Sequence, residues 1–263
     1  MHLLLKTDAI ILKEEDSGEF DKIFTIFSKN FGKIKVIGKS IRKKDAKLKY
    51  ILQVLNYINL ELIEGKNFYI VCDATLKNNF QDIRNNFSRI KIALKILNNI
   101  DDFLQGEEED RRIWNLILLS IQKLSQPGNY RMKNLKIFYF YFIWKLISFL
   151  GFNPELYRCV SCKMPLQEKK FYSKKERKQK YQKNYFNGYF LIKDGGLLCQ
   201  ECSIGYHDKK IAVSPNTIKL LRLVLKGDRI LKKIRISQDD EEELKKVTGG
   251  FVDYFGISKF NFN

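Results

Sequence analysis

The 263-residue chain has only two histidines and four prolines, and it has no long uninterrupted hydrophobic run. So few histidines leave little material for histidine-based acid–base catalysis. The most apolar stretch, residues 135–152, contains two lysines. It is shorter than the roughly 20 apolar residues that span a bilayer, so we expect a buried helix. The first residues lack the pattern of a secretory signal, so we expect a cytoplasmic protein, without membrane attachment, whose thiols stay reduced.

Sequence motifs of common enzymes are also missing. The chain contains no phosphate-binding loop, no glycine-rich dinucleotide fingerprint and no His-Glu-x-x-His pair. The acidic stretch "EEDSGEFD" at residues 14–21 has the composition of a carboxylate metal site, but it falls where a turn between strands is expected. We therefore expect a protein that is not an enzyme, with a metal-dependent nuclease as a minor alternative.

Positive charge is abundant, with 48 Lys and Arg against 30 Asp and Glu, a formal net charge of +18. Such a chain attracts polyanions, although a general richness in lysine would raise the charge as well. Residues 29–50 concentrate nine basic side chains against the single acid Asp45. This cluster favours sequence-independent phosphate binding over a solvated loop. Three nearby aromatics are candidates for base stacking, or for ordinary packing: Phe20, Phe31 and Tyr50.

Hydrophobic periodicity divides the chain into two parts. Residues 1–78 contain about five short runs with strand-like alternation, the size of a small closed barrel such as an OB-fold. From residue 79 onward the period becomes helical, with helices expected near 113–125, 131–150 and 214–228, and a last one from Ser237. The predicted fold class is α+β: an N-terminal OB-fold barrel (1–78), then a helical domain (79–263) with an insert at about 155–210.

Four of the five cysteines form two Cys-x-x-Cys pairs separated by 36 residues: Cys159, Cys162, Cys199 and Cys202. Two such pairs supply the four thiolates of a closed tetrahedral site, so we expect one structural zinc ion per chain. An iron–sulfur cluster, redox chemistry and metal-free structural cysteines are the alternatives, and His207 is a weak candidate ligand. The spacer is long because of a basic stretch at 169–184. Cys72 is expected to be buried in a strand.

Three stretches of the chain together resemble the bacterial RecO family of DNA repair and recombination mediators. They are "GEFDKIFTIFSKNFGKIKVIGKSIRKK" (18–44), "FLGFNPELYRCVSC" (149–162) and "GGLLCQEC" (195–202). Two departures are Lys163, where the family often has glycine, and the longer segment between the cysteine pairs. The resemblance implies an OB-fold, a zinc-bearing helical domain with the four cysteines as ligands, and no catalysis.

The same resemblance implies a function and its residues. Family members bind single- and double-stranded DNA and anneal complementary strands. They act with RecR and the tail of the single-stranded-DNA-binding protein SSB to load RecA, in the bacterial cytoplasm at the nucleoid. By position, Lys39, Arg42, Lys43 and Lys44 would form the DNA-contacting loop. Lys35 and Lys47 belong to the same basic cluster and complete our candidates. An RNA-binding or ribosome-associated adaptor is the alternative.

Overall fold

The computed structural model of the chain describes residues 3–126, 135–166, 188–227, 234 and 236–254. These residues fall into two compact units, 1–146 and 147–263, which are described in turn. The basic stretch 169–184 and the expected start of the helix at 131 lie outside the described residues. The expected domain boundary between residues 78 and 79 stays a prediction.

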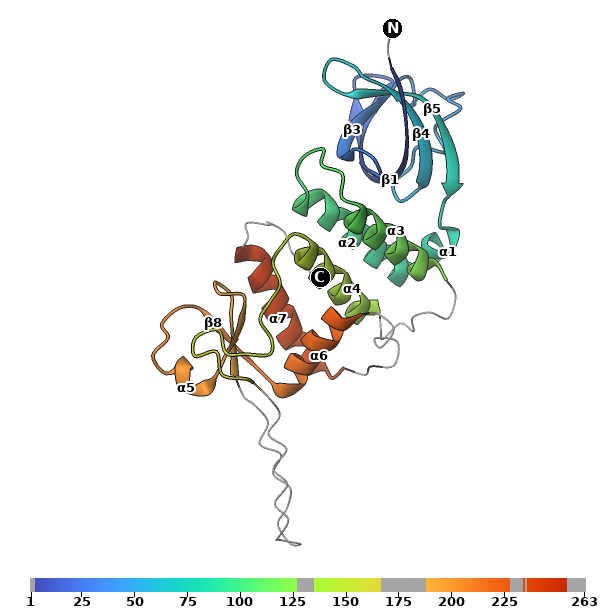
Figure 1. The fold of residues 1–263 in the computed structure, drawn as a ribbon. Coiled ribbons are helices and arrows are strands. Elements are labelled where there is room, and N and C mark those ends of the chain that lie inside the picture. The colour runs from blue at the N-terminus through green and yellow to red at the C-terminus, as the bar shows by residue number, and fades with distance from the viewer. Residues whose placement is uncertain (1–2, 127–134, 167–187, 228–233, 235, 255–263) are drawn as a thin grey trace. The chain divides into compact units, whose positions relative to one another are not determined.

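Five strands form the closed barrel of the first unit (Figure 1). They are β1 (Leu4–Ser17), β2 (Asp21–Ser28), β3 (Gly32–Gly38), β4 (Tyr57–Ile63) and β5 (Tyr69–Asn78). Neighbouring strands follow the order β1-β2-β3-β5-β4. All pairings are antiparallel except that of β3 with β5, which is parallel and pairs only Val36 with Tyr69 and Ile37 with Ile70. The predicted OB-like barrel is confirmed.

Alternating side chains explain why these segments form strands around a core. In β4, Ile58, Leu60 and Leu62 are fully buried, whereas the residues between them are partly exposed. Successive strand side chains point to opposite faces, so this alternation places one face inside the barrel. Burying each large apolar side chain contributes about 1.5–3 kcal/mol. The core also includes Phe24, Ile26, Ile34 and Val36.

Four helices follow the barrel: α1 (Gln81–Arg84), α2 (Phe87–Phe103), α3 (Arg111–Ser125) and α4 (Leu135–Phe149). The side chains of Asn86 and Asp110 cap α2 and α3 by accepting hydrogen bonds from backbone N–H groups of the first turn. Trp114 of α3 lies against the barrel, with its ring 6.4 Å from that of Phe27 and 6.1 Å from that of Tyr57. Helices α1 to α3, and α4 as far as Leu146, are part of the same compact unit as the barrel.

Helix α4 is apolar on nearly every side, as expected for a buried helix. Phe138, Phe142 and Trp144 have no exposed surface. Tyr139 accepts a 2.6 Å hydrogen bond from the Asn99 side chain, which satisfies both polar groups inside the protein. Among the described residues, no helix combines the length and apolarity that a membrane span requires.

The second unit combines a small sheet with two longer helices. Its elements are β6 (Gly188–Leu191), β7 (Gly196–Leu198), α5 (Gln200–Ser203), β8 (Lys210–Val213), α6 (Pro215–Lys226) and α7 (Gln238–Tyr254). The strands form an antiparallel sheet in the order β7-β6-β8, which the sequence did not lead us to expect. The expected start of α6 is confirmed, since Ser214 is its N-cap and Pro215 its first residue.

Candidate functional sites

The four paired cysteines meet at one point in the second unit. The sulfur atoms of Cys159, Cys162, Cys199 and Cys202 all lie within 4.8 Å of one another. Cys162 Sγ and Cys199 Sγ are 3.9 Å apart, far beyond the length of a disulfide bond. A tetrahedron with metal–sulfur bonds of about 2.3 Å has sulfur–sulfur edges of about 3.8 Å. The cluster therefore has the size of a tetrahedral four-thiolate metal site.

Backbone hydrogen bonds join the two cysteine pairs. The N–H of Val160 donates to the Leu197 carbonyl over 2.8 Å, and the N–H of Cys199 approaches Cys159 Sγ at 3.4 Å. Gly196 lies at the junction, where an added Cβ would stand 2.5 Å from a Val160 methyl group. A segment more than 30 residues further along the chain thus docks closely against the first pair, and that docking brings the sulfur atoms together.

The ionisation of the thiols differs within the cluster. Burial raises the pKa of Cys159, but N–H groups of Cys199, Cys162 and Ser161 outweigh it and lower that pKa to about 6. Burial and the neighbouring thiols raise the pKa of Cys199 to about 12. Crowded sulfur atoms do not all ionise at neutral pH by themselves. A bound cation is what would hold four thiolates together here.

The remaining cysteine and the candidate histidine are not members of this cluster. Cys72 is exposed on β5, so the expectation that it is buried was wrong. The reason is strand alternation: its neighbour Val71 faces the barrel core, which turns Cys72 outward. His207 is exposed in the segment that follows α5. Among the described residues, the group of His, Cys, Asp and Glu side chains that could hold a metal ion consists of the four cysteines, without His207.

The segment between β3 and β4, residues 39–56, is the basic loop of the barrel. It is folded by successive tight turns, in which the N–H groups of Lys43, Ala46 and Lys49 each donate to the carbonyl three residues earlier. Ile41 and Leu52 anchor it in the barrel core. Its exposed residues include five of our six candidates for DNA contact: Lys39, Arg42, Lys43, Lys44 and Lys47. The sixth, Lys35, is exposed on β3 outside the loop.

Acidic residues of the β1–β2 hairpin neutralise part of this loop. Lys39 Nζ lies 2.8 Å from Asp21 Oδ2, and Asp21 Oδ1 accepts from the Ser40 N–H over 2.7 Å. Arg42 lies 3.4 Å from an Asp16 carboxylate oxygen and donates to the Gly18 carbonyl. Within the described part of the chain, Lys44 and Lys47 form no ion pair. The sequence pattern did not reveal these carboxylate partners.

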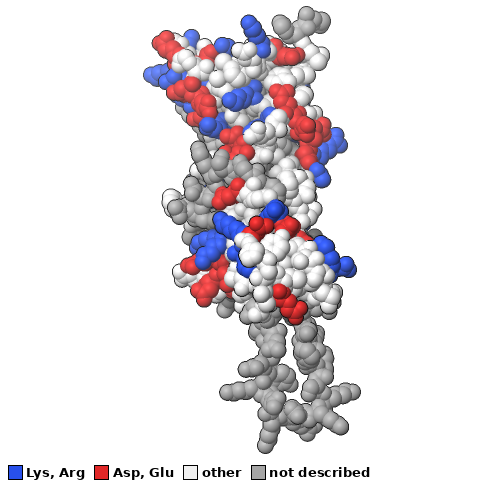
Figure 2. Space-filling model, turned by 90° about the vertical axis from the view of Figure 1, so that its left-hand side faces the viewer, with Lys and Arg blue, Asp and Glu red and all other residues white. Residues whose placement is uncertain are grey.

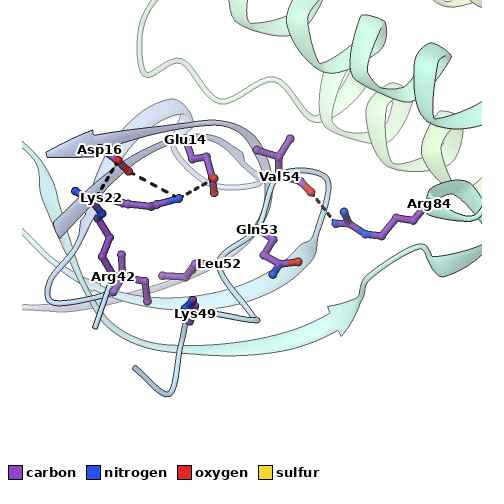
Figure 3. Close-up of a pocket in the computed structure, with 10 residues that line it drawn as sticks. Glu14, Asp16, Lys22, Arg42, Lys49, Leu52, Gln53, Val54 and Arg84 are labelled. Atoms are coloured by element: carbon purple, nitrogen blue, oxygen red, sulfur yellow. Dashed lines mark hydrogen bonds and ion pairs between the residues drawn. The ribbon is translucent and has the colours of Figure 1, made fainter. Parts of the chain in front are cut away.

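A groove of about 530 Å³ separates the hairpin from the loop (Figure 3). Three of its four cations have partners: Lys22 pairs with Glu14, Arg42 with Asp16, and Arg84 donates to the Val54 carbonyl. Four cations and two acids line this groove, a net charge of +2, and two of the four cations are held in ion pairs with those acids. Four acids of the stretch 14–21 thus lie in ion pairs with basic side chains: Glu14, Glu15, Asp16 and Asp21.

The candidate aromatics have different surroundings. Phe20 is 41% exposed, and the Lys43 ammonium lies 5.3 Å from its ring centre. Tyr50 is 74% exposed in the basic loop. Phe31 is partly buried and stacks on Tyr69 with ring centres 6.2 Å apart, so it serves packing. The structure thus leaves Phe20 and Tyr50 open to a ligand.

Charge of both signs is visible on the surface. On the face drawn in Figure 2, basic and acidic groups alternate over the barrel at the top of the view. The net positive charge of the chain is therefore not gathered into one uninterrupted patch on that face. Local clusters such as the basic loop matter more than total charge for placing a polyanion.

The first unit is an OB-like barrel followed by helices, and the second unit holds a cluster of four cysteines with the size of a metal site. The chain is therefore an OB-like barrel protein with an additional unit that has a candidate metal site. The family model "Recombination protein O N terminal" matches residues 1–80, and "Recombination protein O C terminal" matches residues 84–255. The chain belongs to the RecO family, and its function lies in DNA repair and recombination.

Curated relatives match almost the whole chain. A protein named DNA repair protein RecO from Acetivibrio thermocellus is 31% identical over 94% of this chain and 90% of its own length. Proteins of the same name from Thermoanaerobacter and Alkaliphilus metalliredigens are 27% and 25% identical, covering 95% and 99% of this chain and 91% and 97% of their own lengths. The predicted family is confirmed.

Proposed function

We propose that the chain is a non-enzymatic recombination mediator that binds single- and double-stranded DNA and anneals complementary strands. The observation that carries the proposal is the exposed basic loop of residues 39–56 on an OB-like barrel in a RecO-family chain. Exposed lysine and arginine side chains neutralise phosphates and release counterions, which requires no particular base sequence. Family membership favours DNA over the RNA-binding alternative.

The proposal includes partners and a cofactor. RecR and the SSB tail are the expected protein partners, with RecA loaded indirectly, in the cytoplasm at the nucleoid. Cys159, Cys162, Cys199 and Cys202 would hold one structural zinc ion. The sulfur–sulfur spacing of the cluster and the preference of zinc for closed four-thiolate sites support this assignment. The metal would fold the second unit and take no part in annealing.

Removing the charge of the loop tests the DNA function. The variant carries glutamine at Lys39, Arg42, Lys43 and Lys44, and strand annealing and binding are measured at several salt concentrations. Each lost phosphate contact lowers the slope of log affinity against log salt by about 0.7 for single strands. Losing four contacts would lower it by about 3, and annealing would slow in parallel.

A matched variant separates a local site from total charge. It carries glutamine at four exposed lysines outside the loop: Lys6, Lys91, Lys193 and Lys209. The control should keep most of the wild-type affinity and slope. Equal losses in both variants would show that net charge, and not this loop, binds DNA. A wild-type protein that binds no DNA at low salt would refute the proposal.

A further inference from the structure

A second groove, of about 330 Å³, lies on another side of the basic loop. Its apolar walls are formed by Ile41, Ala46, Leu48 and Val71. These residues belong to the barrel core or pack against it, so the walls rest on a rigid base. Lys39, Lys43 and Lys47 line the same groove. We call the part formed by the four apolar residues the slot, and the three lysines the rim.

Strand pairing explains why the barrel has an opening at this place. The parallel contact between β3 and β5 is limited to two residue pairs and ends at Ile37 and Ile70. Gly38 and Val71, the next residue on each strand, both line the groove. The basic loop starts directly after Gly38 and lies beside this gap. The slot therefore follows from the topology of the barrel together with the course of the loop.

The lining residues of this groove and of the groove in Figure 3 have the same net charge of +2, but fewer of the cations here are held by acids. Lys39, Lys43 and Lys47 line it against one acid, Asp45, a net charge of +2. Lys39 is paired with Asp21, but Lys47 forms no ion pair with any described residue. Two of the three lysines of this groove, Lys43 and Lys47, thus lie outside any ion pair with a described residue and can contact the phosphates of a ligand.

We propose that this groove takes one unpaired base of single-stranded DNA, with the flanking phosphates held by Lys43 and Lys47. An apolar slot suits the flat face of a base, and the lysine rim suits the phosphates on either side of it. A duplex keeps its bases stacked and paired, so it reaches the rim but leaves the slot empty. The inference rests on the proposed DNA function and adds a preference for single strands.

The test compares two single strands of equal length and equal charge. One is an oligothymidine, and the other carries abasic residues in place of its bases. Wild-type protein should bind the oligothymidine tighter by on the order of fivefold, the low end for burial of one base. The Ala46→Phe variant fills the slot, so it should lose this preference and keep its affinity for the abasic strand and for a duplex.

Two further variants keep the test decisive. Lys47→Gln should weaken both strands alike, because it removes a phosphate contact, and should leave the preference for the oligothymidine unchanged. Should Ala46→Phe fail to fold, the comparison of the two strands on wild-type protein still tests the slot. Ala212→Phe, at an exposed position of β8, is the matched control and should behave as wild type.

Different failures point to different errors. Equal wild-type binding of both strands overturns the groove assignment alone, whereas no binding of either strand overturns the proposed function with it. The assignment is also overturned if an acidic peptide displaces DNA from wild type but not from Ala46→Phe, since the occupant would then be a protein.

Discussion

Lys163 has a left-handed backbone conformation, with φ of 61°, in the turn that follows the first cysteine pair. Its N–H donates to the Cys159 carbonyl over 2.9 Å, which closes the turn around the sulfur atoms. Residues other than glycine are strained there, by about 1–2 kcal/mol. A glycine at this position, which the family resemblance led us to expect, would avoid this strain, whereas Lys163 adopts the strained conformation.

Replacing Lys163 should therefore stabilise or destabilise the second unit according to the new side chain. We expect Lys163→Gly to raise the free energy of unfolding by up to about 1 kcal/mol, because the left-handed strain is relieved. Lys163→Val should lower it, since a β-branched side chain fits this conformation worst. Thermal melts of the metal-loaded protein measure both changes, and the opposite order would contradict the explanation.

Asp8 is a second residue whose environment makes a measurable prediction. Its carboxylate lies 2.6 Å from Lys77 Nζ and accepts hydrogen bonds from Asn59 and Tyr57. Burial raises the pKa of Asp8, but these three partners outweigh it and hold the pKa below its usual value. A lowered carboxyl pKa stabilises the fold above the unfolded value of about 3.9, and this contribution is lost as pH falls through the folded pKa.

We accordingly expect Asp8→Asn to destabilise the barrel by about 1–3 kcal/mol at pH 7. The difference from wild type should begin to shrink below about pH 4, where the carboxyl of the unfolded chain takes up a proton, and should become smallest below the lowered pKa of the folded protein. Denaturant unfolding at several pH values measures it. Asp45→Asn, at an exposed loop position, should change stability little at any pH. A penalty for Asp8→Asn that does not vary with pH would exclude the charge as its cause.

At the scale of elements, strand β7 brings the two cysteine pairs together. Gly196 of β7 leaves no room for a side chain, since an added Cβ would lie 2.8 Å from the Glu155 carbonyl oxygen as well as 2.5 Å from Val160. Gly196→Ala should therefore push β7 away and lower metal affinity and the stability of the second unit, by several kcal/mol at most. Metal titration and melting of the purified variant measure these effects.

Gly205→Ala is the matched control for that substitution. An added Cβ at Gly205 meets no atom within 4 Å, so the same chemical change should be tolerated. If both variants behave alike, the close approach of β7 is not what organises the cysteine cluster.

Regular periodicity determined which elements could be predicted from the sequence. The barrel strands and the longer helices follow from alternation and from capping residues such as Ser214. The sheet β7-β6-β8 was missed because its strands have only three or four residues, too few to establish a period. The pairing of Asp16 and Asp21 with the basic loop was also missed, because it joins segments that only the barrel brings together.

At the scale of the whole molecule, the two candidate sites occupy different compact units. The basic loop lies within residues 1–146 and the cysteine cluster within residues 147–263. A folding role for the metal and a DNA-binding role for the barrel should therefore be separable by experiment. The Cys-x-x-Cys spacing predicted which four cysteines come together. The charge that the basic loop can offer to DNA depends on its ion pairs with Asp16 and Asp21, and residue spacing does not reveal those pairs.

Removal of the metal should accordingly unfold one unit and spare the other. We expect about one zinc ion per chain by elemental analysis, and we expect chelation or Cys162→Ser to expose the amides of β6, β7, β8, α6 and α7 to hydrogen exchange. Amides of the barrel should stay protected, because formation of a structural metal site contributes folding energy to the segment that it closes. Cys72→Ser, at the exposed cysteine outside the cluster, should change neither metal content nor exchange. If the metal-free protein keeps wild-type protection from hydrogen exchange throughout, the second unit does not need the ion to stay folded. If elemental analysis finds iron and the protein absorbs visible light, the cysteines hold an iron–sulfur cluster and not zinc.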